Sequence, residues 1–133
     1  MPSKYLTKRL ILGIHRDQIN SFGGSHGIRD EGLLDSALEQ PKATFGGKAL
    51  HPSIFDQAAA YLFHLVNDHA FVDGNKRIAL AAADTFLRLN GHRLTLPDKK
   101  LYRLVIDSST GMLNKDSLAK ILRENSRSKE EAD

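Results

Sequence analysis

Apolar residues recur every three or four positions along most of the chain, as they do on the buried face of an amphipathic helix. Five of the predicted helices begin after residues whose side-chain oxygens can cap a helix N-terminus: Thr7, Asp30, Ser53, Asp98 and Asn114. Glycine and proline predict where the first two end, at Gly23-Gly24 and at Pro41. Residues 42–52 are rich in glycine and proline and predict a loop.

One further helix, predicted from about Asn75 to Leu89, has a different pattern. Its first half, Ile78–Ala83, is apolar all round, which is typical of a helix enclosed by others. Residues 93–96 alternate and predict a minor strand, whereas the polar residues 126–133 predict a tail that frays. We therefore expect an all-α fold over residues 1–125, a compact single-domain bundle of about six helices around a buried central helix.

The length and composition of the chain limit the kinds of protein that it can be. The 133 residues suffice for one domain, and 41% hydrophobic and 26% charged residues are typical of a globular protein. The longest apolar run, Ile78–Ala83, is far shorter than the roughly 20 residues of a membrane span, so we expect no membrane partner. Without cysteine there are no disulfides or thiolate metal sites. The chain start is also a poor signal peptide, so we expect a cytoplasmic protein.

The segment His69–Arg77 places several chemically active side chains at the start of the central helix. Helix N-termini bind phosphate because their first backbone N–H groups are unpaired. Lys76 and Arg77 are repelled there by the positive end of the helix dipole, which slightly destabilises the helix. A bound phosphate would turn this repulsion into a favourable interaction. Asp73 offers the hard oxygen that Mg²⁺ prefers, and His69 can take up a proton near neutral pH.

Each of these residues alone has an ordinary structural explanation. A loop histidine is usually structural or solvated, Asp-Gly is a common turn, and Lys-Arg on a helix usually faces water. Phe71 is expected in the core, where it would anchor the loop. The combination of residues is what indicates phosphate chemistry.

The segment resembles the motif of the Fic/Doc family, His-x-Phe-x-acid-Gly-Asn-Gly/Lys-Arg, at every position that carries chemistry. The resemblance extends over roughly residues 5–125. Outside the motif it rests on Ile14-His15, Gly23-Gly24, Gly27–Asp30, Leu33–Leu38, Phe45–Gly47 and Asn90-Gly91.

This resemblance implies an enzyme that transfers part of a nucleotide to a serine or threonine hydroxyl of a target protein. By the same resemblance His69 is the general base and Asp73 holds Mg²⁺. The phosphates of ATP are then held by Gly74, Asn75, Lys76 and Arg77.

Two positions bear on the branch of the family. Many AMP-transferring members have glycine and a second arginine where this chain has Lys76 and Leu80. Both differences resemble Doc, the toxin of a toxin–antitoxin pair, which phosphorylates elongation factor Tu. Gly74, in contrast, is the ordinary Fic residue where the phage Doc toxin has alanine, so AMP transfer stays an alternative. The inhibitory Ser/Thr-x-x-x-Glu-Gly/Asn helix is missing, which implies restraint by a separate antitoxin.

A non-enzymatic helical module, binding either DNA or a protein partner, is the alternative of a different class. The net charge of +3 is small, and the basic residues are scattered instead of gathered on one recognition helix. Ile78–Ala83 could not face a DNA groove, so we expect no direct nucleic acid binding. His15 and His26 are expected to be structural.

Overall fold

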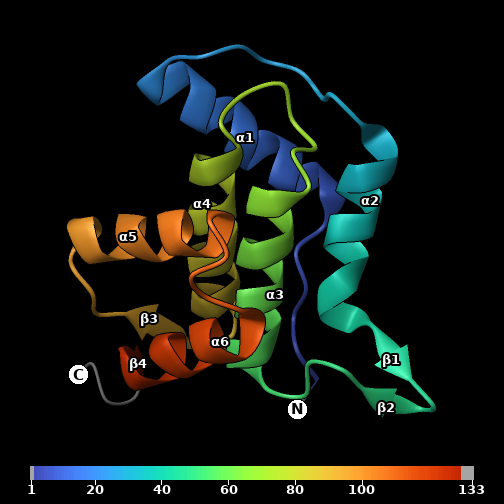
Figure 1. Ribbon diagram of the computed structural model, residues 1–133, viewed down its shortest axis with the longest axis vertical. Coiled ribbons are helices and arrows are strands. Elements are labelled where there is room, and N and C mark those ends of the chain that lie inside the picture. Colours follow the sequence, from blue (N-terminus) through green and yellow to red (C-terminus); the bar gives the residue numbers. More distant parts are fainter. Residues whose placement is uncertain (1, 130–133) are drawn as a thin grey trace.

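The computed structural model describes residues 2–129, and the predicted all-α fold is confirmed for them (Figure 1). The α-helices are α1 (Lys8–Phe22), α2 (Glu31–Glu39), α3 (Ile54–Asn67), α4 (Asn75–Leu89), α5 (Asp98–Ser109) and α6 (Lys115–Glu124). A short 3₁₀ helix, η1 (Gln40–Lys42), follows α2. Two small sheets pair β1 (Thr44–Phe45) with β2 (Lys48–Ala49) and β3 (His92–Leu94) with β4 (Ser126–Ser128).

The predicted caps begin four of the helices. The side chains of Thr7, Asp30, Ser53 and Asn114 each accept a hydrogen bond from a backbone N–H of the first turn. The prediction for the fifth was wrong by one residue. Pro97 is the N-cap of α5 and Asp98 is its first helical residue, where its carboxylate interacts favourably with the helix dipole.

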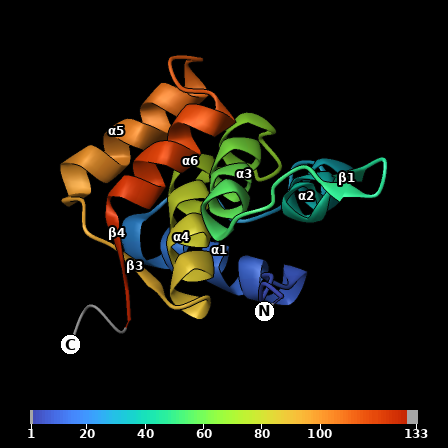
Figure 2. The ribbon, with the colours of Figure 1, turned by 90° about the horizontal axis from the view of Figure 1, so that it is seen from below.

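Helix α4 is central, with α3 along one side and α1 and α5 against others (Figures 1 and 2). Most of its apolar face is fully buried, through Ile78, Ala79, Ala82, Ala83, Phe86 and Leu87. The expectation that Ile78–Ala83 is enclosed on all sides needs one correction. Leu80 and Ala81 are only half-buried, because they line a groove between α4 and α5.

The loop predicted at 42–52 contains the β1–β2 hairpin, which projects away from the helices in both views (Figures 1 and 2). The predicted minor strand is confirmed as β3. The prediction of a frayed tail was wrong for Ser126–Ser128, which pairs antiparallel with β3. This pairing uses backbone groups, so the polar side chains gave no sign of it. Residues 130–133 lie outside the described part of the chain.

None of the helices within residues 2–129 combines the length and hydropathy that a bilayer-spanning helix requires.

Candidate active site

The segment between α3 and α4, residues 68–74, forms a loop that the side chain of Asn75 holds closed. The Asn75 Oδ1 accepts a hydrogen bond from the Phe71 N–H at 3.1 Å, and its Nδ2 donates to the Phe71 carbonyl at 3.0 Å. Sequence analysis assigned Asn75 to phosphate binding, but its amide is used to shape the loop. Its backbone N–H belongs to the first turn of α4, where such groups have no helical partner.

Phe71 anchors the loop in the core, as expected. Its side chain is 2% exposed and stacks on the ring of His15, with centroids 3.9 Å apart and an angle of 12° between the planes. The His15 Nε2 lies 2.8 Å from the Asp73 carbonyl oxygen. Because a carbonyl can only accept, this nitrogen carries the proton and donates it. His15 is therefore structural, and it fixes the loop at both Phe71 and Asp73.

A second segment, residues 23–30, runs beside the loop, and we call it the latch. The Val72 N–H donates to the Gly27 carbonyl at 3.0 Å, and Ile28 forms an antiparallel bridge with Phe71. The N–H groups of Arg29 and Asp30 both donate to the Ala70 carbonyl, at 2.8 and 3.0 Å. The latch therefore holds the loop along most of its length. No composition or spacing in the sequence signals these backbone contacts.

The carboxylate of Asp73 accepts two backbone hydrogen bonds, from Ser25 N–H to Oδ2 at 3.1 Å and from Gly74 N–H to Oδ1 at 2.8 Å. These two hydrogen bonds lower the pKa of Asp73, and the bond from Ser25 contributes most. The carboxylate is therefore ionised at neutral pH. Gly24 makes the contact possible, because a Cβ there would lie 2.7 Å from Asp73 Oδ2. An exposed, ionised carboxylate is the donor type that suits Mg²⁺.

Gly74, the N-cap of α4, has a left-handed backbone with φ of 74°. A Cβ at this position would lie 3.0 Å from the Cδ1 of Ile19 on α1. The left-handed conformation and the close packing against α1 therefore both favour glycine at this position.

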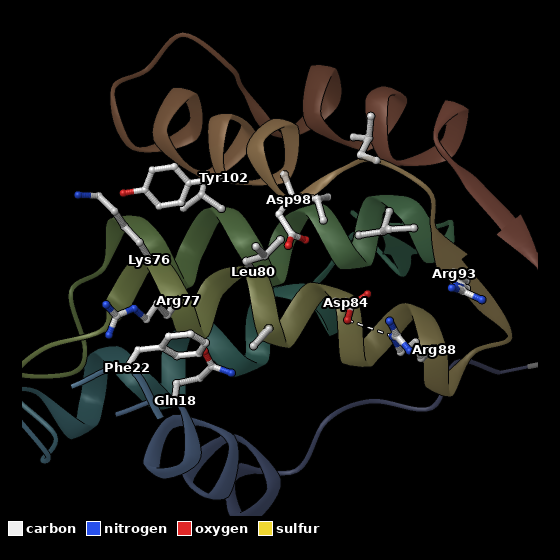
Figure 3. A pocket seen from close by; sticks show the side chains of 15 residues that line it. Gln18, Phe22, Lys76, Arg77, Leu80, Asp84, Arg88, Arg93, Asp98 and Tyr102 are labelled. Carbon is white, nitrogen blue, oxygen red and sulfur yellow. Dashed lines mark hydrogen bonds and ion pairs between the residues drawn. The ribbon is translucent and has the colours of Figure 1, made fainter. Parts of the chain in front are cut away.

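The two cations expected to hold phosphate are both exposed on the first turn of α4. The Arg77 Nη1 donates to the Gly23 carbonyl at 3.0 Å, and its guanidinium lies over the ring of Phe22, 5.2 Å from the centroid. Its other N–H groups remain able to bind an anion. Lys76 lies beside it, and Tyr102 of α5 lines the same pocket (Figure 3).

The predicted site residues line one cavity of about 500 Å³. They are His69, Asp73, Gly74, Asn75, Lys76 and Arg77. Sequence analysis missed several further lining residues, among them Phe22 of α1 and Tyr102 and Ser109 of α5. Their distance along the chain from the motif leaves no local pattern that could have identified them.

A groove of about 570 Å³ adjoins this cavity, between α1, α4, α5 and β3 (Figure 3). The two share Phe22, Lys76, Arg77 and Tyr102. Apolar side chains line much of the groove, including Leu80, Ala81, Leu94, Leu96, Leu101 and Val105. An ion pair between Asp84 and Arg88, at 3.0 Å, lies farther along α4.

Within residues 2–129 there is no group of three or more His, Asp or Glu side chains that could hold a metal ion. Mg²⁺ is commonly bound by one or two carboxylates together with the phosphates of a substrate. Asp73, which lines the cavity at the N-terminus of α4, offers one such carboxylate.

Comparison with known proteins agrees with the motif. Residues 5–87 match the model of the Fic/DOC family. The chain is 53% identical to Toxin Doc of Mycolicibacterium smegmatis over 74 residues, which is 56% of this chain and 57% of that relative. It is 28% identical to Protein kinase doc of Escherichia phage P1 over 120 residues, covering 90% of this chain and 94% of the relative.

Replacing Asn75 tests whether its side chain holds the loop. Asn75→Ala removes both hydrogen bonds to the Phe71 backbone, so we expect a loss of about 1–3 kcal/mol in the free energy of unfolding. The Phe71 amide should also exchange faster with deuterium. Asn20→Ala, at an exposed position on α1, is the control and should change neither quantity. Unchanged exchange at Phe71 in Asn75→Ala would contradict the assignment.

Proposed function

The chain belongs to the Fic/DOC family, in its Doc branch, and on this premise we propose that it is a toxin-type protein phosphotransferase. It moves the γ-phosphate of ATP to a serine or threonine hydroxyl of a target protein. The observation that carries this proposal is the cavity at the N-terminus of α4, which gathers a histidine, an ionised carboxylate and two cations. The printed names of the relatives, Toxin Doc and Protein kinase doc, support it.

In the proposed reaction His69 accepts the proton of the target hydroxyl. The hydroxyl oxygen forms a bond to the γ-phosphorus, the bond from that phosphorus to the β,γ-bridging oxygen breaks, and ADP leaves. The N–H groups of the first turn of α4, with Lys76 and Arg77, hold the phosphates. Phosphoryl transfer depends mainly on positioning and on neutralising charge, and these are what the cavity residues provide.

Asp73 would hold Mg²⁺ together with phosphate oxygens, because its carboxylate is ionised and exposed at the cavity. Bound there, the ion would neutralise negative charge on the nucleotide. Ser25 and Gly74 keep the carboxylate in place through their N–H groups.

Two features support transfer of phosphate over transfer of AMP. Lys76 puts a compact positive charge where AMP-transferring members have glycine, which favours a nucleotide lying with its terminal phosphate toward His69. The nucleoside can then extend past Lys76 and Arg77 into the largely apolar groove. In the opposite orientation the groove would receive pyrophosphate. Leu80 then leaves out the second arginine that many AMP-transferring members have, and the groove's other cations besides Lys76 and Arg77, which are Arg88 and Arg93, lie at its far end.

The partners are part of the same proposal. Elongation factor Tu is the proposed target, so the reaction would block translation in the cytoplasm. A cognate antitoxin supplied as a separate chain is the proposed restraint, in keeping with the toxin named among the relatives.

Replacement of His69 tests the general base. We expect His69→Ala to lower transfer by about 10²–10⁴-fold and to leave the fold intact, because the side chain is exposed. Purified protein is incubated with elongation factor Tu and with ATP labelled at either the α or the γ phosphate. His26→Ala, another exposed loop histidine, is the matched control.

Label from the γ position on the target, lost in His69→Ala, supports the proposal. Label from the α position would show AMP transfer instead. Full activity of His69→Ala would remove this residue from the mechanism.

Replacement of Arg77 tests the phosphate site. Charge-assisted hydrogen bonds contribute about 1.5–3 kcal/mol, so Arg77→Ala should bind ATP about 10- to 100-fold more weakly, with or without Mg²⁺. Asp73→Asn should weaken only the part of the affinity that depends on the metal. Calorimetric titration measures both, with Arg16→Ala, an exposed arginine on α1 that lines neither the cavity nor the groove, as control. Equal affinity in Arg77→Ala and the wild type would contradict the site.

Replacement of Lys76 tests the reason given for phosphate transfer. Lys76→Gly should reduce phosphotransfer, because the terminal phosphate loses a positive charge. Lys76→Met fills a similar space without the charge and should reduce it as well. If both variants transfer γ-phosphate at the wild-type rate, Lys76 does not orient the nucleotide. That result would hold even if the product is a phosphoprotein.

A further inference from the structure

His69 has an unusual backbone conformation. Its φ is 51°, and within residues 2–129 it is the one residue other than glycine with a positive φ. A side chain with a Cβ is strained in this region, so surrounding contacts must hold the residue there. The conformation matters because the backbone dihedral angles set the direction in which the imidazole points from the backbone.

Both peptide groups that flank His69 are bound by a single side chain. The Arg29 Nε donates to the His69 carbonyl at 2.6 Å, and its Nη2 donates to the Asp68 carbonyl at 3.3 Å. Rotation about φ of His69 turns the peptide group that contains the Asp68 carbonyl, and rotation about ψ turns the one that contains its own carbonyl. A planar guanidinium bound to both carbonyls therefore restrains both dihedral angles.

The backbone of Arg29 is also held in place by hydrogen bonds. Its N–H and that of Asp30 donate to the Ala70 carbonyl, and the Asp30 side chain caps α2. These contacts belong to the backbone and to Asp30, so they persist when only the side chain of Arg29 is changed.

Arg29 does not line the cavity that contains His69, and its guanidinium is bound to two carbonyls of the loop. We propose that Arg29 is a positioning residue: it holds His69 in its left-handed conformation, so that the imidazole is presented to the target hydroxyl. This inference rests on the proposed function for its effect on transfer. Its structural part, the restraint on the His69 backbone, can be measured without any activity.

The test compares Arg29→Ala with Arg29→Lys, which keeps a donor on a long side chain and can bind one of the two carbonyls. The first measurement is the intraresidue NOE between the amide and α protons of His69, which is strong when φ is positive. It should weaken in Arg29→Ala and recover in part in Arg29→Lys. Arg16→Ala, an exposed arginine on α1, should leave it unchanged.

The second measurement is transfer itself. A misplaced general base lowers kcat, so we expect a fall of about 10- to 100-fold in Arg29→Ala with ATP affinity unchanged. Arg29→Lys should recover part of the rate. The lysine of Arg29→Lys can still donate to one of the two carbonyls. This variant can therefore be measured even if the Arg29→Ala protein does not fold.

Three results would overturn the inference: an unchanged NOE, an unchanged kcat in an active enzyme, or a loss confined to ATP affinity, which would place Arg29 on the nucleotide. If the wild type transfers no label from ATP, the proposed function fails. A weakened NOE in Arg29→Ala would still support the restraint on His69.

Discussion

The two hydrogen bonds between the Asn75 side chain and the Phe71 backbone are the interaction on which the rest of the site depends. They join the first residue of α4 to the loop that precedes it, and they place Phe71 in the core against His15. Ala70 is buried with Phe71, and the residues that flank this pair, His69 and Val72, lie at the surface. His69 and Asp73 therefore remain exposed on the same loop, facing one cavity.

The burial of α4 explains why the charges gather where they do. From Ile78 onward most of this helix is enclosed by its neighbours, which leaves its first turn and one groove-facing side at the surface. Lys76 and Arg77 lie on the exposed first turn, where the helix dipole opposes a cation, whereas the exposed Arg88 lies in the last turn, where the dipole favours one. Unpaired N–H groups together with two cations at a helix N-terminus suit the binding of an anion, because an anion would offset the repulsion between these cations and the helix dipole.

The sequence predicted the helices well and named side chains that the structure brings into one cavity, but it did not reveal the contacts that hold these side chains in place. Caps such as Thr7 and Asn114 act over three residues, so local pattern reveals them. The latch binds backbone groups about 40 residues farther along the chain, as where the Arg29 N–H donates to the Ala70 carbonyl, and no side-chain pattern indicates that pairing. Asn75 shows the same limit. Its residue type is compatible both with binding phosphate and with holding the loop, and only the structure shows that its amide is bound to the Phe71 backbone.

The contacts that build the loop and those that build the groove come from different parts of the chain. His15, the latch and the motif all lie within residues 5–87, the part that matches the family model. The opposite wall of the groove, from Arg93 to Val105, follows that part. The proposed base, carboxylate and cations therefore come from α4 and the loop before it, while α5 adds Tyr102 and Ser109 to the cavity and, with β3, forms the groove wall. If the proposed nucleotide spans the cavity and the groove, a change in the part of the wall beyond Tyr102 can alter which part of it is accommodated without disturbing His69 or Asp73. This separation offers a physical route by which members of one family can share a histidine and an anion site yet transfer different parts of the same nucleotide.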